Sequence, residues 1–259
     1  MIQVGIVGYG HVGRLTHRIF EEAIIYDNDS KILSAKHEEI QRCEIVFICV
    51  PTPSAVDGSA DCGAIRDILS WLDGPLPVIR STVPPGTTED LISETNRPIL
   101  VWPEYVGDWP YSDRTDLASK GFPAVLLGGP PKERRRLVEV LAHRLGSHTR
   151  FLQASPTAVE LAKYMENAWL AMQVTFANEF ADLSSSLNVD YWEVRELWGA
   201  DPRVSLAHTA VTSVGGGFGG KCLPKDLDAI LHVAAREGVP TPLLSGVKAA
   251  NRLRTSAGG

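Results

Sequence analysis

The stretch Ile2-Gln3-Val4-Gly5-Ile6-Val7-Gly8-Tyr9-Gly10-His11-Val12-Gly13 decides the fold of the first part of the chain. Its first half is a short apolar run typical of a strand, and its second half has the pattern GxGxxG. A helical pattern follows at residues 14–22, and a second strand-like run at residues 23–26 ends in Asp27. Strand, glycine turn, helix, strand and acid, in this order, predict a Rossmann-type βαβ unit.

The glycine turn predicts a site for NAD. Gly8, Gly10 and Gly13 permit a tight turn and let the pyrophosphate approach the helix N-terminus. Asp27 lies roughly 20 residues beyond the first glycine, where an acid bonds both ribose hydroxyls and repels a 2′-phosphate. We therefore predict NAD rather than NADP; the alternative is a loop that merely contains glycines. The remaining predicted cofactor-binding residues lie in the same loop or at later strand ends: His11, Val12, Pro51, Thr52 and Thr82.

The pattern of strands and helices continues to about residue 153. Apolar runs at residues 44–50, 77–80, 98–102 and 124–127 read as strands, and residues 62–72 and 132–145 read as helices. Such alternation predicts an α/β domain, residues 1–153, built on a doubly wound parallel sheet with ligands at the carboxyl ends of the strands.

Residues 154–259 predict a smaller all-helical domain. Residues 157–186 contain no glycine or proline, and an apolar stripe on them predicts a long central helix, too apolar for a free surface element. Lys163 and Asn167 lie one turn apart on it and need polar partners, unless Lys163 sits at the edge and extends to solvent. A shorter helix at residues 190–198 carries Trp192 and Trp198, which we expect in the core, and residues 242–254 predict the last helix.

The glycine-rich stretch at residues 215–226, GGGFGGKCLPKD, ends in a cysteine at the start of a predicted helix, residues 223–237. The helix N-terminus and the neighbours Lys221 and Lys225 favour the thiolate form of Cys222. A thiolate on a glycine cradle is suited to nucleophilic catalysis. The alternative is a small buried cysteine beside a flexible linker.

Composition narrows the class of protein. The chain has 259 residues and a formal net charge of -6, so we expect no broad nucleic-acid surface. Its four cysteines have no metal-ligand or disulfide spacing, which predicts no metal site and favours a reducing cytoplasm. The first strand begins at residue 2, so we expect no signal peptide, and no apolar run is long enough to predict a membrane span.

The segment GFGGKCLPKD resembles the active-site loop of the UDP-glucose/GDP-mannose dehydrogenase family, GFGG-x-C-x-x-KD. The resemblance extends to VPTP at residues 50–53, STVPPGTTE at 81–89, PE at 103–104 and ELAKYMENA at 160–168. It implies that Cys222 is the nucleophile and that Asp226 is catalytic. It also implies that Lys163 and Asn167 stabilise a developing oxyanion, although the same K-x-x-x-N pair occurs in β-hydroxyacid dehydrogenases.

Two further catalytic residues follow from the resemblance alone. Thr82 would line the site, and Glu104 would activate water. Without the resemblance, Thr82 reads as an ordinary loop cap and Glu104 as a solvated surface acid. The substrate-binding residues implied by the resemblance are Glu104, Tyr105, Val106, Lys163, Asn167, Arg203, Phe218 and Gly219. In the family the arginine matched by Arg203 reaches the substrate across a dimer interface, which implies a homodimer through the helical domain.

The sequence departs from the family in two places. The region between Asp27 and Glu44 is short, and the chain stops in the helix that would lead into the family's C-terminal nucleotide-sugar-binding domain. We therefore expect a short member acting on a nucleotide sugar or on a smaller sugar or nucleotide, or one whose site a partner completes.

The expected activity is the NAD-dependent four-electron oxidation of a primary alcohol to a carboxylate through a Cys222 thiohemiacetal and thioester. Two alternatives stay open: a single β-hydroxyacid-type oxidation that uses Lys163, and a non-catalytic NAD-binding subunit.

Overall fold

The computed structural model describes residues 2–29, 31–32, 34–105, 124–146, 148–211 and 216–255. The chain divides into two compact units. The first unit consists of Met1–Pro53 and Ala60–Lys163, and the second of Ser54–Ser59 and Tyr164–Gly259. The division falls within the long helix α6 (Pro156–Ser186). The domain boundary predicted at residues 153 and 154 stays a prediction.

The first unit is built on one sheet, which has seven strands among the described residues, in the order β2-β1-β3-β4-β5-β6-β7. The strands are β1 (Val4–Val7), β2 (Ile24–Tyr26), β3 (Ile45–Ile48), β4 (Leu76–Ile79), β5 (Leu100–Val101), β6 (Ala124–Gly128) and β7 (Arg150–Ala154). The predicted α/β fold is confirmed, with one correction: β5 and β6 pair antiparallel, whereas every other pair is parallel. Strand β7 escapes prediction because Arg150 and Gln153 interrupt its apolar pattern.

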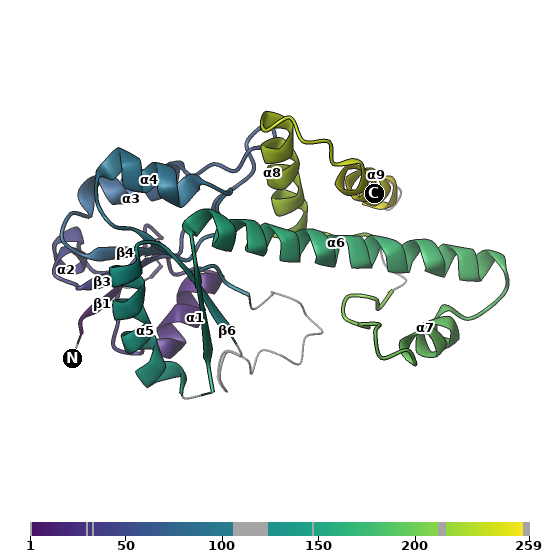
Figure 1. Ribbon diagram of the computed structural model, residues 1–259, viewed down its shortest axis with the longest axis horizontal. Coiled ribbons are helices and arrows are strands. Elements are labelled where there is room, and N and C mark those ends of the chain that lie inside the picture. The colour runs from purple at the N-terminus through teal and green to yellow at the C-terminus, as the bar shows by residue number, and fades with distance from the viewer. Residues whose placement is uncertain are drawn as a thin grey trace. The chain divides into compact units, whose positions relative to one another are not determined.

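Helices cover both faces of this sheet (Figure 1). Strand alternation sends Ile6 and Phe47 to one face, where they pack with α1 (His11–Ile19) and α5 (Pro131–Leu145). It sends Val7 and Ile48 to the other, where they pack with α2 (His37–Gln41), α3 (Gly63–Trp71) and α4 (Thr87–Thr95). This doubly wound arrangement leaves the carboxyl ends of the strands for ligands.

The second unit is helical. It contains most of α6, together with α7 (Tyr191–Gly199), α8 (Leu223–Arg236) and α9 (Pro242–Thr255). Its core joins small residues of α6, such as Ala171 and Val174, to Phe218, Leu227 and Val247. The predicted bounds of these helices agree with the structure to within one residue.

The apolar residues of α6 and α7 are less buried than the sequence predicts. Trp192 and Trp198, expected in the core, are 48% and 39% exposed. On α6, Met165 and Trp169 are 74% and 54% exposed, because the small residues form the side that packs within the unit. One side of α6 therefore packs in a core, as expected of a helix too apolar to be a free surface element, whereas Met165 and Trp169 are exposed in the single chain.

Within the described ranges, no helix is both long enough and apolar enough to cross a membrane.

Candidate active site

The turn after β1 is a cradle that only glycine can form. Gly8 has a φ of +92°, and a Cβ there would lie 2.8 Å from the carbonyl oxygen of Cys49. A Cβ on Gly13 would lie 2.0 Å from the carbonyl oxygen of Gly8. Gly10 is the N-cap of α1, so the first turn of the helix begins with His11 and Val12, three residues earlier than predicted. Its unpaired backbone N–H groups are suited to a pyrophosphate.

Asp27 lies at the end of β2 and is held in place by the backbone. Its carboxylate accepts hydrogen bonds from the N–H of Tyr9 at 2.5 Å and from the N–H of Asp29 at 2.7 Å. A cavity of about 390 Å³ opens beside it, with Gly8, Asp27 and Pro51 among its lining residues. Three of the predicted cofactor residues therefore line one cavity.

An aromatic group lines the same cavity and was not predicted. The rings of His37 and Trp71 stack with centroids 3.9 Å apart, and the ring of Tyr26 lies 4.6 Å from that of His37. One face of α3 contributes Ala64, Asp67, Ile68 and Trp71 to the lining. Their i, i+3, i+4, i+7 spacing is the signal by which the sequence could have indicated this wall.

The loops after β3 and β4 are tied together. The hydroxyl of Thr52 donates to the carbonyl oxygen of Thr82 at 2.7 Å, and the hydroxyl of Ser81 donates to that of Val50 at 2.6 Å. Thr52 is buried and Thr82 is half-buried. The structure thus places two predicted cofactor residues side by side at the carboxyl end of the sheet.

Glu104 is buried rather than solvated, which overturns the alternative that it is a surface acid. Its carboxylate forms an ion pair with the guanidinium of Arg80 and accepts a hydrogen bond from the N–H of Tyr105 at 2.8 Å. Arg80 is fully buried, lies 3.6 Å above the ring of Trp102, and donates to the carbonyl oxygen of Trp102. No sequence pattern marks Arg80 as a site residue, because it reads only as the last residue of a strand.

Lys163 is also buried, so the alternative of an edge lysine extended to solvent is wrong. Its ammonium group lies 4.6 Å from the centroid of the Tyr105 ring, a cation–π distance. The first unit therefore brings Lys163 to Tyr105, the residue next to Glu104.

The second unit contains a buried polar group at the start of α8. The amide of Asn167 donates to the carboxylate of Asp226 at 2.5 Å, and the ammonium of Lys225 contacts the other oxygen at 2.5 Å. Both Asn167 and Asp226 are buried. The catalytic role predicted for Asp226 stays a prediction.

Cys222 is the N-cap of α8, and its carbonyl oxygen accepts the N–H of Asp226 at 2.9 Å. It is exposed, whereas Cys43, Cys49 and Cys62 are buried. Burial raises the pKa of the Cys43 thiol to about 11 and that of Cys49 to about 12, so neither forms a thiolate readily. The alternative that Cys222 is a buried packing residue is therefore wrong.

The remaining predicted substrate residues differ in their settings. Phe218 is buried in the core of the second unit, and Gly219 is exposed. Arg203 is exposed and pairs with Asp201 at 2.5 Å. Val106 lies outside the described residues. The substrate-binding roles of these residues stay predictions.

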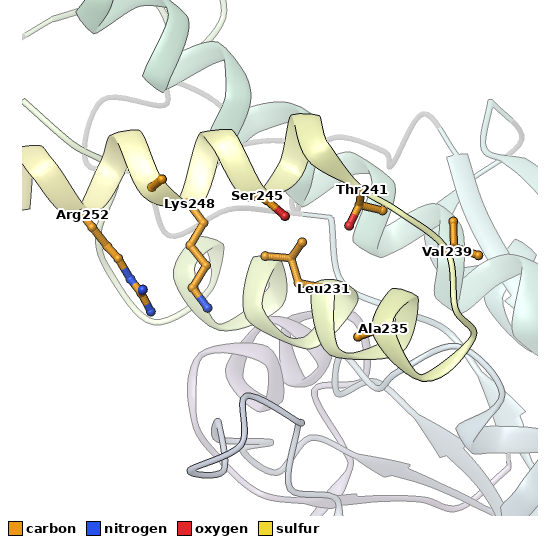
Figure 2. A pocket seen from close by; sticks show the side chains of 8 residues that line it. Leu231, Ala235, Val239, Thr241, Ser245, Lys248 and Arg252 are labelled. Carbon is orange, nitrogen blue, oxygen red and sulfur yellow. The ribbon is translucent and has the colours of Figure 1, made fainter.

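A second cavity, of about 360 Å³, lies between α8 and α9 (Figure 2). Leu231 of α8 faces Ser245 and Lys248 of α9 across it. Cys222 and Asp226 are not among its lining residues, so it is separate from the polar group at the start of α8. Among the residues that the structure describes, no three His, Cys, Asp or Glu side chains lie close enough together to hold a metal ion.

The doubly wound sheet, the glycine cradle and the acid at the end of β2 define a dinucleotide-binding protein of the Rossmann type. Residues 18–99 match the NAD binding domain of the UDP-glucose/GDP-mannose dehydrogenase family, and residues 157–253 match the central domain of that family. The chain belongs to this family. The predicted family and the predicted NAD cofactor are thereby confirmed.

Curated relatives agree with this family. The putative UDP-glucose 6-dehydrogenase YtcA of Bacillus subtilis is 27% identical over 89% of this chain and 55% of its own length. The UDP-glucose 6-dehydrogenase of Pseudomonas aeruginosa is 31% identical over 83% of this chain and 49% of its own length. The chain therefore spans about half the length of the curated relatives it matches.

Solved structures show the same fold. A UDP-glucose dehydrogenase of the archaeon Pyrobaculum islandicum matches 98% of this chain and 68% of its own, with a TM-score of 0.86 and 25% identity. The 3-hydroxyisobutyrate dehydrogenase of Mycobacterium tuberculosis matches 100% of this chain and 95% of its own, with a TM-score of 0.75 and 17% identity. This second likeness concerns the fold alone.

Proposed function

We propose that this chain is an NAD-dependent dehydrogenase that oxidises the primary alcohol of a nucleotide sugar, or of a related smaller sugar or nucleotide, to a carboxylate. The observation that carries the proposal is the setting of Cys222. It is an exposed thiol at the N-terminus of α8, four residues before a buried aspartate that binds Asn167. Curated relatives that match 83% and 89% of this chain are named UDP-glucose 6-dehydrogenase and putative UDP-glucose 6-dehydrogenase, which supports a nucleotide sugar as the substrate.

The cofactor fits the first unit. Gly8 and Gly13 have no side chains and would admit the pyrophosphate. The backbone N–H groups of His11 and Val12 would donate hydrogen bonds to it, and Asp27 would bind the ribose hydroxyls. Bound NAD would supply the hydride acceptor, once for each oxidation. Thr52 and Thr82 would form the wall of the site at the ends of β3 and β4.

The first oxidation removes a hydride and a proton from the alcohol and leaves an aldehyde. In this proposal Lys163 and Asn167 face the substrate oxygen and stabilise its negative charge as the hydride leaves. Both are buried, so their N–H donors would act where water screens little.

The second oxidation requires a nucleophile, because an aldehyde has no hydride to give until something adds to its carbon. The thiolate of Cys222 would attack the aldehyde carbon, and the oxygen would take up a proton to give a thiohemiacetal. Loss of a hydride and a proton from this adduct gives a thioester. Water deprotonated by Glu104 would then cleave the thioester, which releases the carboxylate and the free thiol. Asp226 would hold Asn167 in place and help to move protons.

A test of this mechanism is the substitution Cys222→Ala. We expect it to abolish acid formation while leaving NAD binding unchanged, because the glycine cradle and Asp27 belong to the first unit. Acid would be measured by mass spectrometry and NAD binding by calorimetry, with Cys62→Ala as a control at a buried thiol. Undiminished acid production by Cys222→Ala would refute the mechanism.

Two other functions remain as alternatives to be tested. A single oxidation in the style of a β-hydroxyacid dehydrogenase would use Lys163 and leave Cys222 idle, and the K-x-x-x-N pair of Lys163 and Asn167 is compatible with it. A non-catalytic NAD-binding subunit would bind the cofactor and turn over nothing, alone or with a partner. Against it stands the intact set of predicted catalytic residues: Thr82, Glu104, Lys163, Asn167, Cys222 and Asp226.

We further propose that the protein is a cytoplasmic homodimer formed through its helical unit. The support for the dimer is the set of exposed apolar side chains on α6 and α7, among them Met165, Trp169 and Trp192. The support for the compartment is that the four cysteines are free thiols. Arg203 would then reach the substrate of the partner subunit.

A further inference from the structure

The glycine-rich stretch before Cys222 is held by two hydrogen bonds at one residue, Phe218. The N–H of Phe218 donates to Oδ1 of Asn251 at 2.7 Å, and Nδ2 of Asn251 donates to the carbonyl oxygen of Phe218 at 2.9 Å. One side-chain amide of α9 therefore satisfies both backbone groups of one loop residue. Phe218 and Asn251 are both buried, so water does not replace these bonds.

The side chain of Phe218 adds a second anchor at the same residue. It packs in the core of the second unit with Leu227 of α8 and Val247 of α9. Beyond Phe218 the chain passes through Gly219 and Gly220, both exposed, and Gly220 has a φ of +75°. A Cβ at Gly219 or Gly220 would meet nothing within 4 Å, so no packing restrains these two residues.

The segment that carries Cys222 runs between two anchored points. At its C-terminal end it enters α8, which begins at Leu223. At its N-terminal end is Phe218, whose backbone is hydrogen-bonded to Asn251. Only Gly219, Gly220 and Lys221 lie between Phe218 and Cys222 in the sequence. Without the amide, the backbone at Phe218 would lose both of these hydrogen bonds, and the glycines beside it have the greatest backbone freedom of any residue.

We propose that Asn251 is a positioning residue for Cys222: its amide fixes the backbone at Phe218 and thereby sets where the glycine-rich loop presents the thiol. The inference rests on the proposed function of Cys222 as the nucleophile. It assigns α9 a role in the site although none of its residues is among the predicted catalytic ones. Asparagine is required because it offers an acceptor and a donor on one short side chain, whereas aspartate cannot donate to the carbonyl oxygen.

Gly217 supplies an independent way to disturb the same contact. A Cβ there would lie 2.6 Å from Oδ1 of Asn251, too close for the amide to stay in place. The φ of Gly217 is not in the left-handed region, so alanine would not strain the backbone. Gly217→Ala should therefore act by displacing the amide, and it should have little effect once the amide is gone.

The experiment is a double-mutant cycle of Asn251→Ala and Gly217→Ala, with Leu243→Ala on the exposed side of α9 as the control. The first readout is hydrogen exchange of a peptide that spans Phe218. We expect each single variant to exchange there roughly 10-fold faster than the wild type, since exchange reports local opening. We expect Gly217→Ala to add almost nothing in the Asn251→Ala background, and Leu243→Ala to leave exchange unchanged.

The second readout is turnover of UDP-glucose. Both single variants should lower kcat by about 10- to 100-fold, the size expected from misplacing a reacting group, with the NAD dissociation constant unchanged. Unchanged exchange at Phe218, or two single effects that add independently, would overturn the proposal. Should Asn251→Ala not fold, Gly217→Ala alone still decides: normal exchange and normal kcat in that variant contradict it. If the wild type turns over no sugar nucleotide, the proposed function fails. Hydrogen exchange in the double-mutant cycle still tests whether the Asn251 amide holds the backbone at Phe218.

Discussion

At the scale of single residues, the burial of a charged side chain determines its environment and its partners, and the sequence alone does not show this burial. Glu104 reads as a surface acid until the fully buried Arg80 appears beside it. The two residues are 24 positions apart, and both follow short apolar strands. Resemblance found Glu104 but not Arg80, because a cation at a strand end has no periodicity or spacing that marks it as a partner.

Loss of the Arg80 charge should destabilise the protein strongly. Arg80→Met keeps most of the side-chain volume but removes the cation of the ion pair with the buried Glu104 carboxylate. We expect the free energy of unfolding to fall by about 3–5 kcal/mol. Urea denaturation measures this free energy. The double variant that combines Arg80→Met with Glu104→Gln should recover part of the loss.

The matched control is the exposed ion pair between Arg66 and Glu94. Because solvent screens this pair, Arg66→Met should lower the free energy of unfolding far less than Arg80→Met does. Equal losses at Arg66 and Arg80 would show that the buried pair does not stabilise the first unit.

At the scale of helices and strands, the sequence predicts long regular elements well and short or context-dependent ones poorly. Helix α6 spans Pro156–Ser186, the range predicted, because a long run without glycine or proline leaves little choice. Strand β7 and helix α4 were not predicted. The N-cap of helix α4 is Gly86, which has no side chain to cap the helix, so the acidic Glu89 and Asp90 in its first turn are the local signal that remains.

The cap of α4 comes from α6. The carboxylate of Glu160 accepts the N–H of Gly86 at 2.7 Å and the N–H of Thr88 at 2.9 Å. Glu160 stands more than 70 positions from both, so the sequence could not show this contact. Glu160→Ala leaves two N–H groups without this acceptor and should cost about 1–3 kcal/mol for each that stays buried. Chemical denaturation measures the change, and Glu89→Ala on the exposed side of α4 is the control.

Burial raises the pKa of Glu160 above its ordinary value of 4.5, and this predicts a pH dependence. A carboxyl with a raised folded-state pKa binds its proton more tightly in the folded state than in the unfolded state. Its contribution is full below the unfolded-state pKa and is lost as pH rises through the folded-state pKa. The stability of the wild type relative to Glu160→Gln should therefore fall as pH rises from 4.5. A difference that grows with pH would contradict the raised pKa.

At the scale of the whole molecule, the exposed apolar side chains of α6 and α7 show a limit of prediction from one sequence. The sequence indicates that this surface is buried, and the structure of a single chain leaves Met165 and Trp169 exposed. Apolar periodicity predicts that a face is covered, but it does not say whether the same chain or a second copy covers it. The predicted homodimer accounts for both observations.

The dimer is tested by placing charges on that surface. We expect Met165→Lys with Trp169→Lys to sediment as a monomer at concentrations where the wild type sediments as a dimer, because two buried charges oppose association. Glu237→Lys, at an exposed site outside both helices, is the control and should stay dimeric. A wild type that is monomeric at all concentrations would contradict the proposed assembly.

The measurement that tests the central proposal most directly is the yield of NADH from a limiting amount of UDP-glucose, compared between the wild type and Cys222→Ala. Oxidation of a primary alcohol through the thiohemiacetal and thioester predicts two NADH for each substrate molecule consumed by the wild type. It also predicts that Cys222→Ala forms no acid and never reaches that yield. A wild type that stops at one NADH, with Cys222→Ala giving the same yield, would contradict the role of Cys222 and favour a single oxidation that uses Lys163.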